Sequence, residues 1–575
     1  MKEMLTNMRV ESVESVETVK DVRRASPSSL RASVRARVLL RRAMRAVVLV
    51  AALFASILAV SPDAAAQRRA TYANPVAAGD FPDPSVIRVG GDYWAVATSS
   101  EWGPEFPILR SRDLVNWDAV GTVFDARPAW SVGNYWAPEI SQHNGRFYVY
   151  YTARKKDGPL CVAVATARRP QGPYRDHGPL VCQEVGSIDG FPVTDERGRR
   201  YLLWKEDGNS VQKPTPIWAQ RLSNDGTRLV GERQEILRNT EPWEKHATLP
   251  YGDLIEGPAV VRRGGWFYMF YSGNFCCARE CNYMMGVARA RSLLGPWEKH
   301  ARNPILKGND NWKCPGHGTV VSDAQGRDWL LYHAMDAKDF VYVGRQALLD
   351  EVTWGRDGWP VINGGRGPSA RADAPRGARA STRDVGFYDE FTTPRLRPGW
   401  QWPHALVPVM RVDTRRQGWL VLSPDASRPE APPIAVVARS TTTGDYEATT
   451  VVETGDLTGG AAAGLSAFGD MENALGVSVG DGKVILWRRE KNEQRLVETE
   501  DAPAGARLHL RMRARDGRRY RFAYSRDGRD WRDLGGEVDG EYLPPWDRGV
   551  RVALVAGGRA GAQARFGFLR VEPSR

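Results

Sequence analysis

Short apolar runs alternate with Gly and Asp turns along most of the chain, and the pattern repeats. Each repeat contains a short apolar run, a turn and then a strand rich in aromatic residues. The repeats lie about 50 to 70 residues apart, a period typical of one four-stranded unit per repeat. Their equivalent first positions are Asp83, Trp136, Asp189, Glu256 and His317.

These repeats predict an all-β fold. Five such units over about residues 72–363 are typical of a five-bladed β-propeller. In a propeller the first strand of every blade lines the central channel, so equivalent positions converge on the axis. We therefore expect three carboxylates, an imidazole and an indole in one pocket. Gathered acids repel one another and burial disfavours their ionisation, so this cluster indicates a function.

A second β-rich region follows a linker. Residues 364–384 are Gly, Ala, Arg, Pro and Ser with few large apolar side chains, a composition typical of linkers. Strand-like runs resume at 419–422 and 483–487, with a hairpin turn signal at Asp516-Gly517. They predict a β-sandwich. The predicted divisions are 1–66 (signal region), 67–363 (propeller), 364–384 (linker) and 385–575 (sandwich).

The N-terminal residues predict export. An apolar run at 46–60 follows a cluster of arginines and precedes three alanines that end at Ala66. This is the pattern of a secretory signal peptide cleaved after Ala66, and the run is too short for a permanent membrane anchor. We expect a secreted or periplasmic protein that has no membrane association after cleavage. Met44 is an alternative start.

Composition excludes two classes of function. Hydrophobic residues make up 42% of the 575 residues, which excludes wholesale disorder. The chain has 80 Lys and Arg against 68 Asp and Glu, but part of that excess lies in the signal region. The remainder forms no basic stripe with interleaved aromatics, so nucleic-acid binding is not expected. The oligomeric state is not indicated by the sequence.

The cysteines favour structural disulfides. Export permits disulfides, and Cys161 and Cys182 flank a stretch that could join two neighbouring strands. The pairing of six cysteines stays open from sequence alone. The group at Cys276, Cys277 and Cys281 lacks a second Cys pair or His pair at zinc spacing, so we expect no metal ligands there. The sixth is Cys314.

Three converging acids suit glycoside hydrolysis. One carboxyl group donates a proton to the leaving oxygen, another handles the nucleophile, and a third can raise the pKa of the donor. No Gly-x-Ser-x-Gly elbow, phosphate-binding loop or His-Glu-x-x-His helix is present to support other hydrolases. Trp136 is expected as pocket wall or sugar platform. Trp102 and Phe106, after the first repeat, are expected to rim the pocket.

In their order along the chain, these motifs resemble glycoside hydrolase family 43. The resemblance implies an inverting five-bladed enzyme, with Asp83 as general base, Asp189 as pKa modulator and Glu256 as general acid. The family contains β-xylosidases, α-L-arabinofuranosidases, arabinanases and galactanases. The matching segments are 80–86, 136–139, 188–189, 256–258, 316–318 and 344–360.

The resemblance also implies binding residues. Arg345 matches an arginine that contacts the sugar, against the alternative of a surface ion pair. His317 matches a histidine that in some members helps to hold a calcium ion through water, against the alternative of a structural histidine. No other cofactor is expected. Residues 387–391 and 400–402 resemble the concanavalin-like domain of family β-xylosidases. Two departures are Gly190, where many members have Pro or Ala, and the stretch 274–277.

Together these features predict a secreted inverting glycoside hydrolase that releases xylose or arabinofuranose from plant cell-wall polysaccharides or oligosaccharides. Its partner is then a carbohydrate substrate, and exo action is favoured over endo. The alternatives are a galactan- or arabinan-cleaving enzyme of the same family and a non-catalytic carbohydrate-binding propeller. A protein-interaction propeller would not need acids at its channel.

Overall fold

The computed structural model describes residues 70–379, 386–415, 418–425, 427, 434–457, 460–559 and 561–574. The predicted signal region lies outside these residues, as does part of the predicted linker. Residues Arg69–Arg575 form one compact unit. No helix within the described residues is long and apolar enough to cross a membrane.

The all-β prediction is confirmed. Five four-stranded antiparallel sheets follow one another over the described residues 85–362, and in each the strands are ordered as in the sequence. The first holds β2 (Ser85–Val89), β3 (Asp92–Val96), β5 (Glu105–Ser111) and β6 (Trp117–Phe124). The second holds β7 (Ser131–His143), β8 (Arg146–Lys155), β9 (Leu160–Ala167) and β10 (Arg175–Val181).

The other three sheets follow the same plan. The third holds β11 (Ser187–Thr194), β12 (Arg200–Glu206), β13 (Ile217–Leu222) and β14 (Leu229–Leu237). The fourth holds β15 (Ile255–Arg263), β16 (Trp266–Gly273), β17 (Met284–Ala290) and β18 (Glu298–Lys299). The fifth holds β19 (Trp312–Ser322), β20 (Asp328–Asp336), β21 (Gln346–Trp354) and β22 (Pro360–Ile362).

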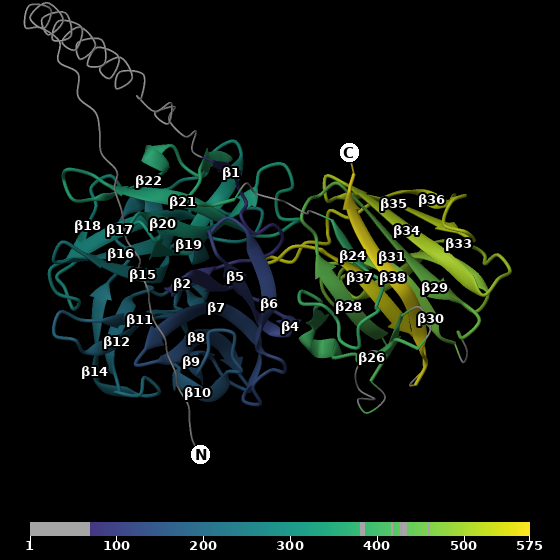
Figure 1. Ribbon diagram of the computed structural model, residues 1–575, viewed down its shortest axis with the longest axis horizontal. Helices are drawn as coiled ribbons and strands as arrows, with labels where there is room; N and C mark the ends of the chain where they lie inside the picture. Colours follow the sequence, from purple (N-terminus) through teal and green to yellow (C-terminus); the bar gives the residue numbers. More distant parts are fainter. Residues whose placement is uncertain are drawn as a thin grey trace, which may run out of the picture. The chain divides into compact units, whose positions relative to one another are not determined.

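The first strands of the five sheets form a closed ring. β2 contacts β7, β7 contacts β11, β11 contacts β15, β15 contacts β19, and β19 returns to β2. Figure 1 shows these strands innermost, with the fourth strands β6, β10, β14, β18 and β22 farthest out. Residues far apart in the sequence are therefore brought together at the inner strands.

Local sequence explains the hairpin that opens each sheet. The second strands carry aromatic and β-branched side chains, and in β8 the run from Phe147 to Ala153 is buried. The turn before a second strand uses a glycine with positive φ at Gly145, Gly198, Gly265 and Gly326. These are the turn positions of the sequence repeat. Glycine adopts positive φ without the steric penalty of a side chain, so it ends the first strand there.

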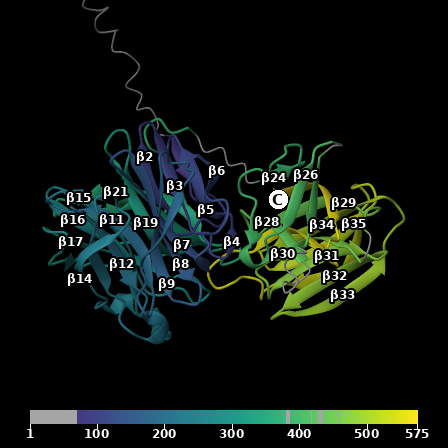
Figure 2. The same ribbon diagram turned by 90° about the horizontal axis from the view of Figure 1, so that it is seen from below.

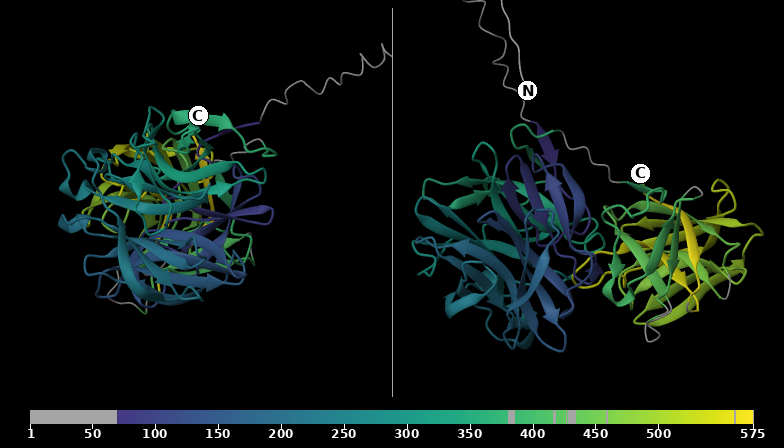
Figure 3. Two further views of the ribbon diagram at one scale, coloured as in Figure 1. Left: turned by 90° about the vertical axis from the view of Figure 1, so that its left-hand side faces the viewer. Right: turned by 60° about the horizontal axis from the view of Figure 1, so that its bottom comes forward.

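The C-terminal strands form two further sheets (Figures 2 and 3). Together they enclose one apolar core that includes Leu420, Leu465 and Phe566. One sheet has the order β26 (Val409–Asp413), β27 (Trp419–Ser423), β38 (Ala564–Pro573), β29 (Tyr446–Glu453), β34 (Arg507–Arg515), β35 (Arg519–Ser525) and β36 (Arg532–Asp539), and β24 (Phe387–Asp389) pairs with β38. The other has the order β28 (Ile434–Ser440), β37 (Arg551–Gly557), β30 (Ala462–Phe468), β31 (Ala474–Gly480), β32 (Lys483–Glu490) and β33 (Glu493–Asp501).

Short elements complete the described fold. Two small pairings join distant segments: β1 (Thr71–Ala73) with β23 (Arg371–Asp373), and β4 (Trp102–Gly103) with β25 (Trp402–Pro403). The second pairing links the first sheet's region to the C-terminal strands. Single 3₁₀ turns are η2 (Asn209–Val211), η3 (Pro242–Glu244), η4 (Pro250–Gly252), η5 (Asn363–Gly365) and η6 (His404–Leu406).

The expectation of structural disulfides is confirmed. Cys161 pairs with Cys182, and the neighbours Cys276 and Cys277 pair with each other. The third disulfide joins Cys281 to Cys314 on β19. Every cysteine of the sequence is thereby used.

Close packing explains the glycine that follows Asp189. A Cβ atom at Gly190 would lie 2.4 Å from Cγ1 of Val162, which is buried on β9. Real Cβ atoms do not approach carbon so closely, so the two positions are coupled. The neighbouring sheet, rather than the site chemistry, accounts for this departure from the family pattern.

We predict that Gly190→Ala lowers the free energy of unfolding by about 1–3 kcal/mol, the usual cost of overpacking a core. The same substitution should cost clearly less in a Val162→Ala background, because the clashing methyl group is gone. Urea denaturation of the wild type, both single variants and the double variant measures this coupling. Strictly additive losses would refute it.

Candidate active site

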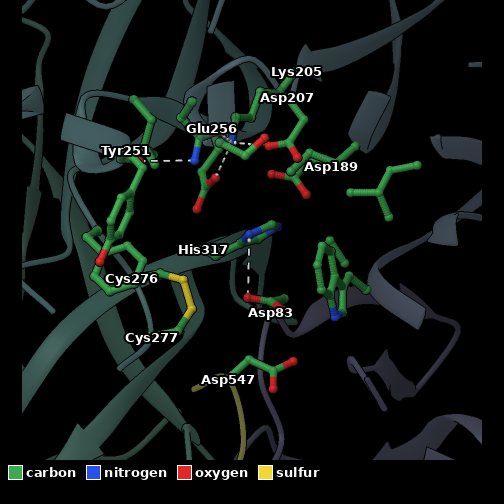
Figure 4. A pocket seen from close by; sticks show the side chains of 18 of the residues that line it. Asp83, Asp189, Lys205, Asp207, Tyr251, Glu256, Cys276, Cys277, His317 and Asp547 are labelled. Carbon is green, nitrogen blue, oxygen red and sulfur yellow. Dashed lines mark hydrogen bonds and ion pairs between the residues drawn. A yellow bond between two sulfur atoms is a disulfide. The ribbon is translucent and has the colours of Figure 1, made fainter. Parts of the chain in front are cut away.

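The five repeat-equivalent side chains line one cavity. Its volume is about 450 Å³, and Asp83, Trp136, Asp189, Glu256 and His317 all border it. Figure 4 shows the three acids around the ring of His317. The structure thus brings together residues that lie more than 200 positions apart in the chain.

A repeated backbone irregularity turns these side chains into the cavity. The registers of β7 with β8, β11 with β12 and β15 with β16 shift just after Trp136, Ile188 and Glu256. Near each site residue one position takes a left-handed φ, including 51° at Asp83 and 61° at Asp189. Such bulges re-aim side chains at the ends of strands. Backbone strain of this kind is concentrated at functional sites.

Asp83 is held as a carboxylate. Its Oδ1 accepts a hydrogen bond from Arg345 Nη1 at 2.8 Å, and its Oδ2 accepts one from Thr98 Oγ1 at 2.7 Å. Nδ1 of His317 lies 3.5 Å from Oδ1. Burial would raise the pKa of Asp83, but the positive charge of Arg345, followed by the electrostatic interaction with His317, outweighs it. They hold the pKa well below its usual range.

The buried side chain of His333 contacts the backbone of the same aspartate. The backbone N–H of Asp83 donates to His333 Nδ1 at 3.1 Å, so this ring nitrogen is an acceptor. Burial lowers the pKa of His333 to about 4, which keeps the imidazole neutral. Its ring stacks on that of Tyr283, with centroids 5.7 Å apart and planes 4° apart.

Asp189 and Glu256 form a coupled pair that holds a proton. Burial, reinforced by the charge of Glu256, raises the pKa of Asp189 to about 7. Burial would also raise the pKa of Glu256, but Lys205 Nζ at 2.8 Å from its Oε2 outweighs burial and lowers it. Tyr283 donates to the other oxygen at 2.8 Å. The cavity therefore offers one firmly ionised carboxylate opposite a pair that carries a proton near neutral pH.

Lys205 neutralises this side of the cavity. Its ammonium is buried and donates to Glu256 and, at 2.9 Å each, to Asp207 and Asn209. Burial lowers the pKa of Lys205, but Asp207 and Glu256 outweigh burial and raise it, so the side chain stays charged. Sequence reasoning missed Lys205. Its signal was its place directly after Trp204, within the aromatic second strand β12 of the third repeat.

Arg345 lies in the cavity beside Asp83, and its contact with a sugar stays a prediction. It lines the cavity, is 4% exposed, and also donates from Nη2 to the backbone oxygen of Asp547 at 3.2 Å. Among the described residues its buried Nε has no hydrogen-bond partner. The alternative of a surface ion pair is wrong, because the pair with Asp83 is buried.

The prediction that Trp102 and Phe106 rim the pocket is wrong. Neither residue lines the cavity, and both are almost fully buried. Trp102 packs edge-on against Phe468 with ring centroids 5.8 Å apart, because β4 pairs with β25. Phe106 belongs to an apolar core between the first two sheets, where its ring meets that of Tyr151.

Other lining residues come from unexpected segments. Trp546 and Asp547, from the C-terminal strand region, border the cavity, and the rings of Trp546 and Trp136 meet edge to face at 5.8 Å. Tyr251, Phe275 and the cysteines 276 and 277 border it elsewhere. No local pattern in the sequence could assign Trp546, because its neighbours carry no repeat signal.

The residues around His317 do not fit a directly bound calcium ion. Calcium takes six to eight oxygen ligands, whereas Asp83, whose Oδ1 lies 3.5 Å from His317 Nδ1, already accepts from Arg345 and Thr98. In the described part of the chain no group of three or more His, Cys, Asp or Glu residues could hold a metal. We therefore derive no catalytic step through a metal ion.

The five-sheet fold and the acid-lined cavity are typical of one class of protein, the carbohydrate-cleaving enzymes. The model of glycosyl hydrolases family 43 matches residues 72–360, and that of the beta xylosidase C-terminal concanavalin A-like domain matches residues 388–572. The chain belongs to glycoside hydrolase family 43. It is a glycoside hydrolase.

Individual relatives agree with this assignment. The chain is 28% identical over 501 residues to xylosidase/arabinosidase 43B of Humicola insolens, covering 81% of this chain and 89% of the relative. The GH43 BlXynB protein from Bacillus licheniformis superposes with a TM-score of 0.74 at 26% identity, over 88% of this chain and 100% of that structure. A xylan beta-1,4-xylosidase from Bacillus halodurans shares the fold at 22% identity, with a TM-score of 0.74 over 87% of this chain and 100% of that one.

We predict that Lys205→Met lowers the free energy of unfolding by about 3–5 kcal/mol, because it leaves buried carboxylates without their counter-charge. The matched control is Lys483→Met, which removes an exposed pair with Asp501 and should cost much less stability. Chemical denaturation at neutral pH measures both. Equal losses would contradict the assigned role of Lys205.

Proposed function

We propose that the protein is an inverting glycoside hydrolase that removes xylose or arabinofuranose from the ends of plant cell-wall polysaccharides or oligosaccharides. The observation that carries the proposal is the placement of the acids in one cavity, with Arg345 2.8 Å from Asp83 and Lys205 2.8 Å from Glu256. Arg345 favours an ionised Asp83, whereas burial raises the pKa of Asp189, so that its pair with Glu256 holds a proton. Inversion needs one base and one acid in the same cavity.

Each acid then has one role. Asp83, charged and oriented by Arg345, removes a proton from the water that attacks the anomeric carbon. Glu256 protonates the leaving oxygen. Asp189 and Glu256 together bind one proton, and when Glu256 carries it, the negative charge of Asp189 stabilises this protonated form. Arg345 binds Asp83 through Nη1, and its buried Nε–H, which has no hydrogen-bond partner among the described residues, suits a sugar hydroxyl.

The five sheets are, in this proposal, the blades of a β-propeller with the site on its axis. The closed ring of first strands supports it, because only a circular arrangement brings β19 back to β2. The xylosidase and arabinosidase names of the relatives support a pentose substrate. Export is proposed from the apolar run near the N-terminus, and the three disulfides support it because disulfides persist in oxidising compartments.

A panel of aryl β-xyloside, α-arabinofuranoside and β-galactoside substrates tests the sugar. Hydrolysis of the galactoside alone would overturn the pentose assignment. NMR of the first-formed product tests the stereochemistry, because inversion and retention give opposite anomers. A retained anomer would overturn the roles of base and acid.

We predict that Glu256→Gln lowers kcat on a pentose disaccharide by about 10²–10⁴-fold, the usual contribution of a general acid. Aryl pentosides with acidic leaving groups should lose much less, since their departure needs little protonation. Glu139→Gln is the matched control: burial raises the pKa of Glu139 to about 8, so it is already neutral at pH 7, and it does not line the cavity. An equal loss on both kinds of substrate would contradict the role of Glu256.

We predict that kcat/KM falls as the pH rises through about 7, where the pair loses its proton. Asp189→Asn should move this alkaline limb to lower pH, because Glu256 then titrates beside Lys205 without a second negative charge. The pH profiles of the two proteins measure the shift. Asp225→Asn, an exposed turn residue between β13 and β14, should leave the profile unchanged; an unmoved limb in Asp189→Asn would refute the coupling.

A further inference from the structure

One wall of the cavity is made by a disulfide between consecutive residues. Cys276 and Cys277 are bonded to each other and both border the cavity. Figure 4 shows the disulfide below Tyr251, with His317 between it and Asp189 in this view. The proposed hydrolysis assigns it no role. Cys277 is 4% exposed, whereas Cys276 is half-buried, so Cys276 is the more accessible of the two.

The loop that carries this disulfide is anchored at both ends. Asn274 is buried, and its Nδ2 donates to the backbone oxygens of Trp243 and Lys245 at 3.2 and 2.7 Å. Farther on, Cys281 is bonded to Cys314, on the strand that also carries His317. The position of the Cys276–Cys277 disulfide is therefore set by the same framework as the catalytic groups.

Loop placement puts the disulfide on the side of Glu256. In the register of β15 with β16, Glu256 lies opposite Ser272, and the loop leaves β16 one residue later, after Gly273. The loop ends at Tyr283, whose hydroxyl donates to Glu256. The acid that protonates the leaving oxygen faces the leaving group, so a surface beside that acid faces it as well.

Two aromatic residues of the cavity wall are far more exposed than the acids. Asp83 is 7% and Glu256 9% exposed, whereas Tyr251 is 40% and Trp546 49% exposed. Tyr251 packs edge to face on Phe275, with ring centroids 5.2 Å apart, next to the disulfide in the sequence. The sugar that is released fits the deep end among the charges. The rings of Tyr251, Phe275 and Trp546 and the disulfide then remain to contact the rest of the substrate.

We propose that the Cys276–Cys277 disulfide is a contact surface for the leaving group and helps to determine which glycosides the enzyme accepts. The proposal rests on the proposed hydrolysis, which defines the leaving group. Sulfur is polarisable and the disulfide has no hydrogen-bond donor, so it suits the C–H face of a sugar ring. The disulfide closes a small covalent ring with the peptide bond between Cys276 and Cys277, so neither side chain can rotate freely. A surface that is rigid before binding avoids the entropy cost of ordering side chains on binding.

The test compares two ligands on a hydrolysis-impaired protein. Glu256→Gln and the triple variant Glu256→Gln/Cys276→Ala/Cys277→Ala are titrated with 1,4-β-xylobiose, with 1,5-α-arabinobiose and with the free pentoses, followed by calorimetry. For the disaccharide that Glu256→Gln binds, loss of the disulfide should raise Kd about tenfold, whereas the Kd of the free pentose should stay within about twofold. Cys161→Ala/Cys182→Ala in the same background removes a disulfide that does not line the cavity and should change neither Kd.

Each result decides. If the Kd for the disaccharide is unchanged, or if the Kd for the free pentose rises equally, the proposal that the disulfide contacts the leaving group is overturned. Hydrolysis of aryl pentosides by the wild type would still uphold the proposed function. Binding of neither disaccharide, together with no hydrolysis, overturns both. Peptide mapping of the native protein by alkylation adds a readout independent of activity: free thiols at Cys276 and Cys277 would refute the inference.

A second route covers a variant that does not fold. A water-soluble phosphine reduces the native disulfide to two thiols, taking an oxygen atom from water to become the phosphine oxide, and alkylation then traps the open form. If peptide mapping shows that only the Cys276–Cys277 disulfide is opened, the Kd for the disaccharide should rise while the Kd for the free pentose stays nearly unchanged. A Kd for the disaccharide that stays unchanged after opening overturns the proposal.

Discussion

The organisation of the cavity depends on the neutralisation of buried negative charge. Three buried carboxyl groups line one cavity, where like charges repel and burial disfavours ionisation. Arg345 pairs with Asp83 and Lys205 pairs with Glu256, each at 2.8 Å. Among the described residues Asp189 has no such ion pair, and burial raises its pKa to about 7. Asp83 therefore stays ionised as a base, whereas Asp189 and Glu256 together retain one proton for the leaving group.

The same charge network reaches the C-terminal sheets. Asp80 accepts the backbone N–H of Arg345 at 3.2 Å with one oxygen, and Arg551 Nη2 and the N–H of Gly549, both at 3.2 Å, with the other. Asp547 meets Arg345 through its backbone oxygen. The arginine that orients Asp83 is thus positioned jointly by both β-rich regions. This shared support gives the C-terminal region a structural part in the site as well as a lining residue, Trp546.

Prediction from the sequence succeeded where one local pattern recurred and failed where contacts were unique. The position of Asp83, Asp189 and Glu256 in one cavity could be inferred, because each stands at the same place in its repeat. Trp102 and Phe106 were misplaced for a related reason: both are aromatic residues near a repeat boundary, and only the pairing of β4 with β25 and the packing of Phe106 on Tyr151 show that they are buried.

By itself the sequence determined the all-β class, the five repeats and the acids that they carry, because alternating apolar positions and turn glycines act over a few residues. The tertiary structure alone decided which acid has a cation, that the cysteines 276 and 277 close on each other, and that Trp546 joins the cavity. Those features depend on distances between residues that are far apart in the chain. Burial and Coulomb interactions vary with such distances, and no local pattern encodes them.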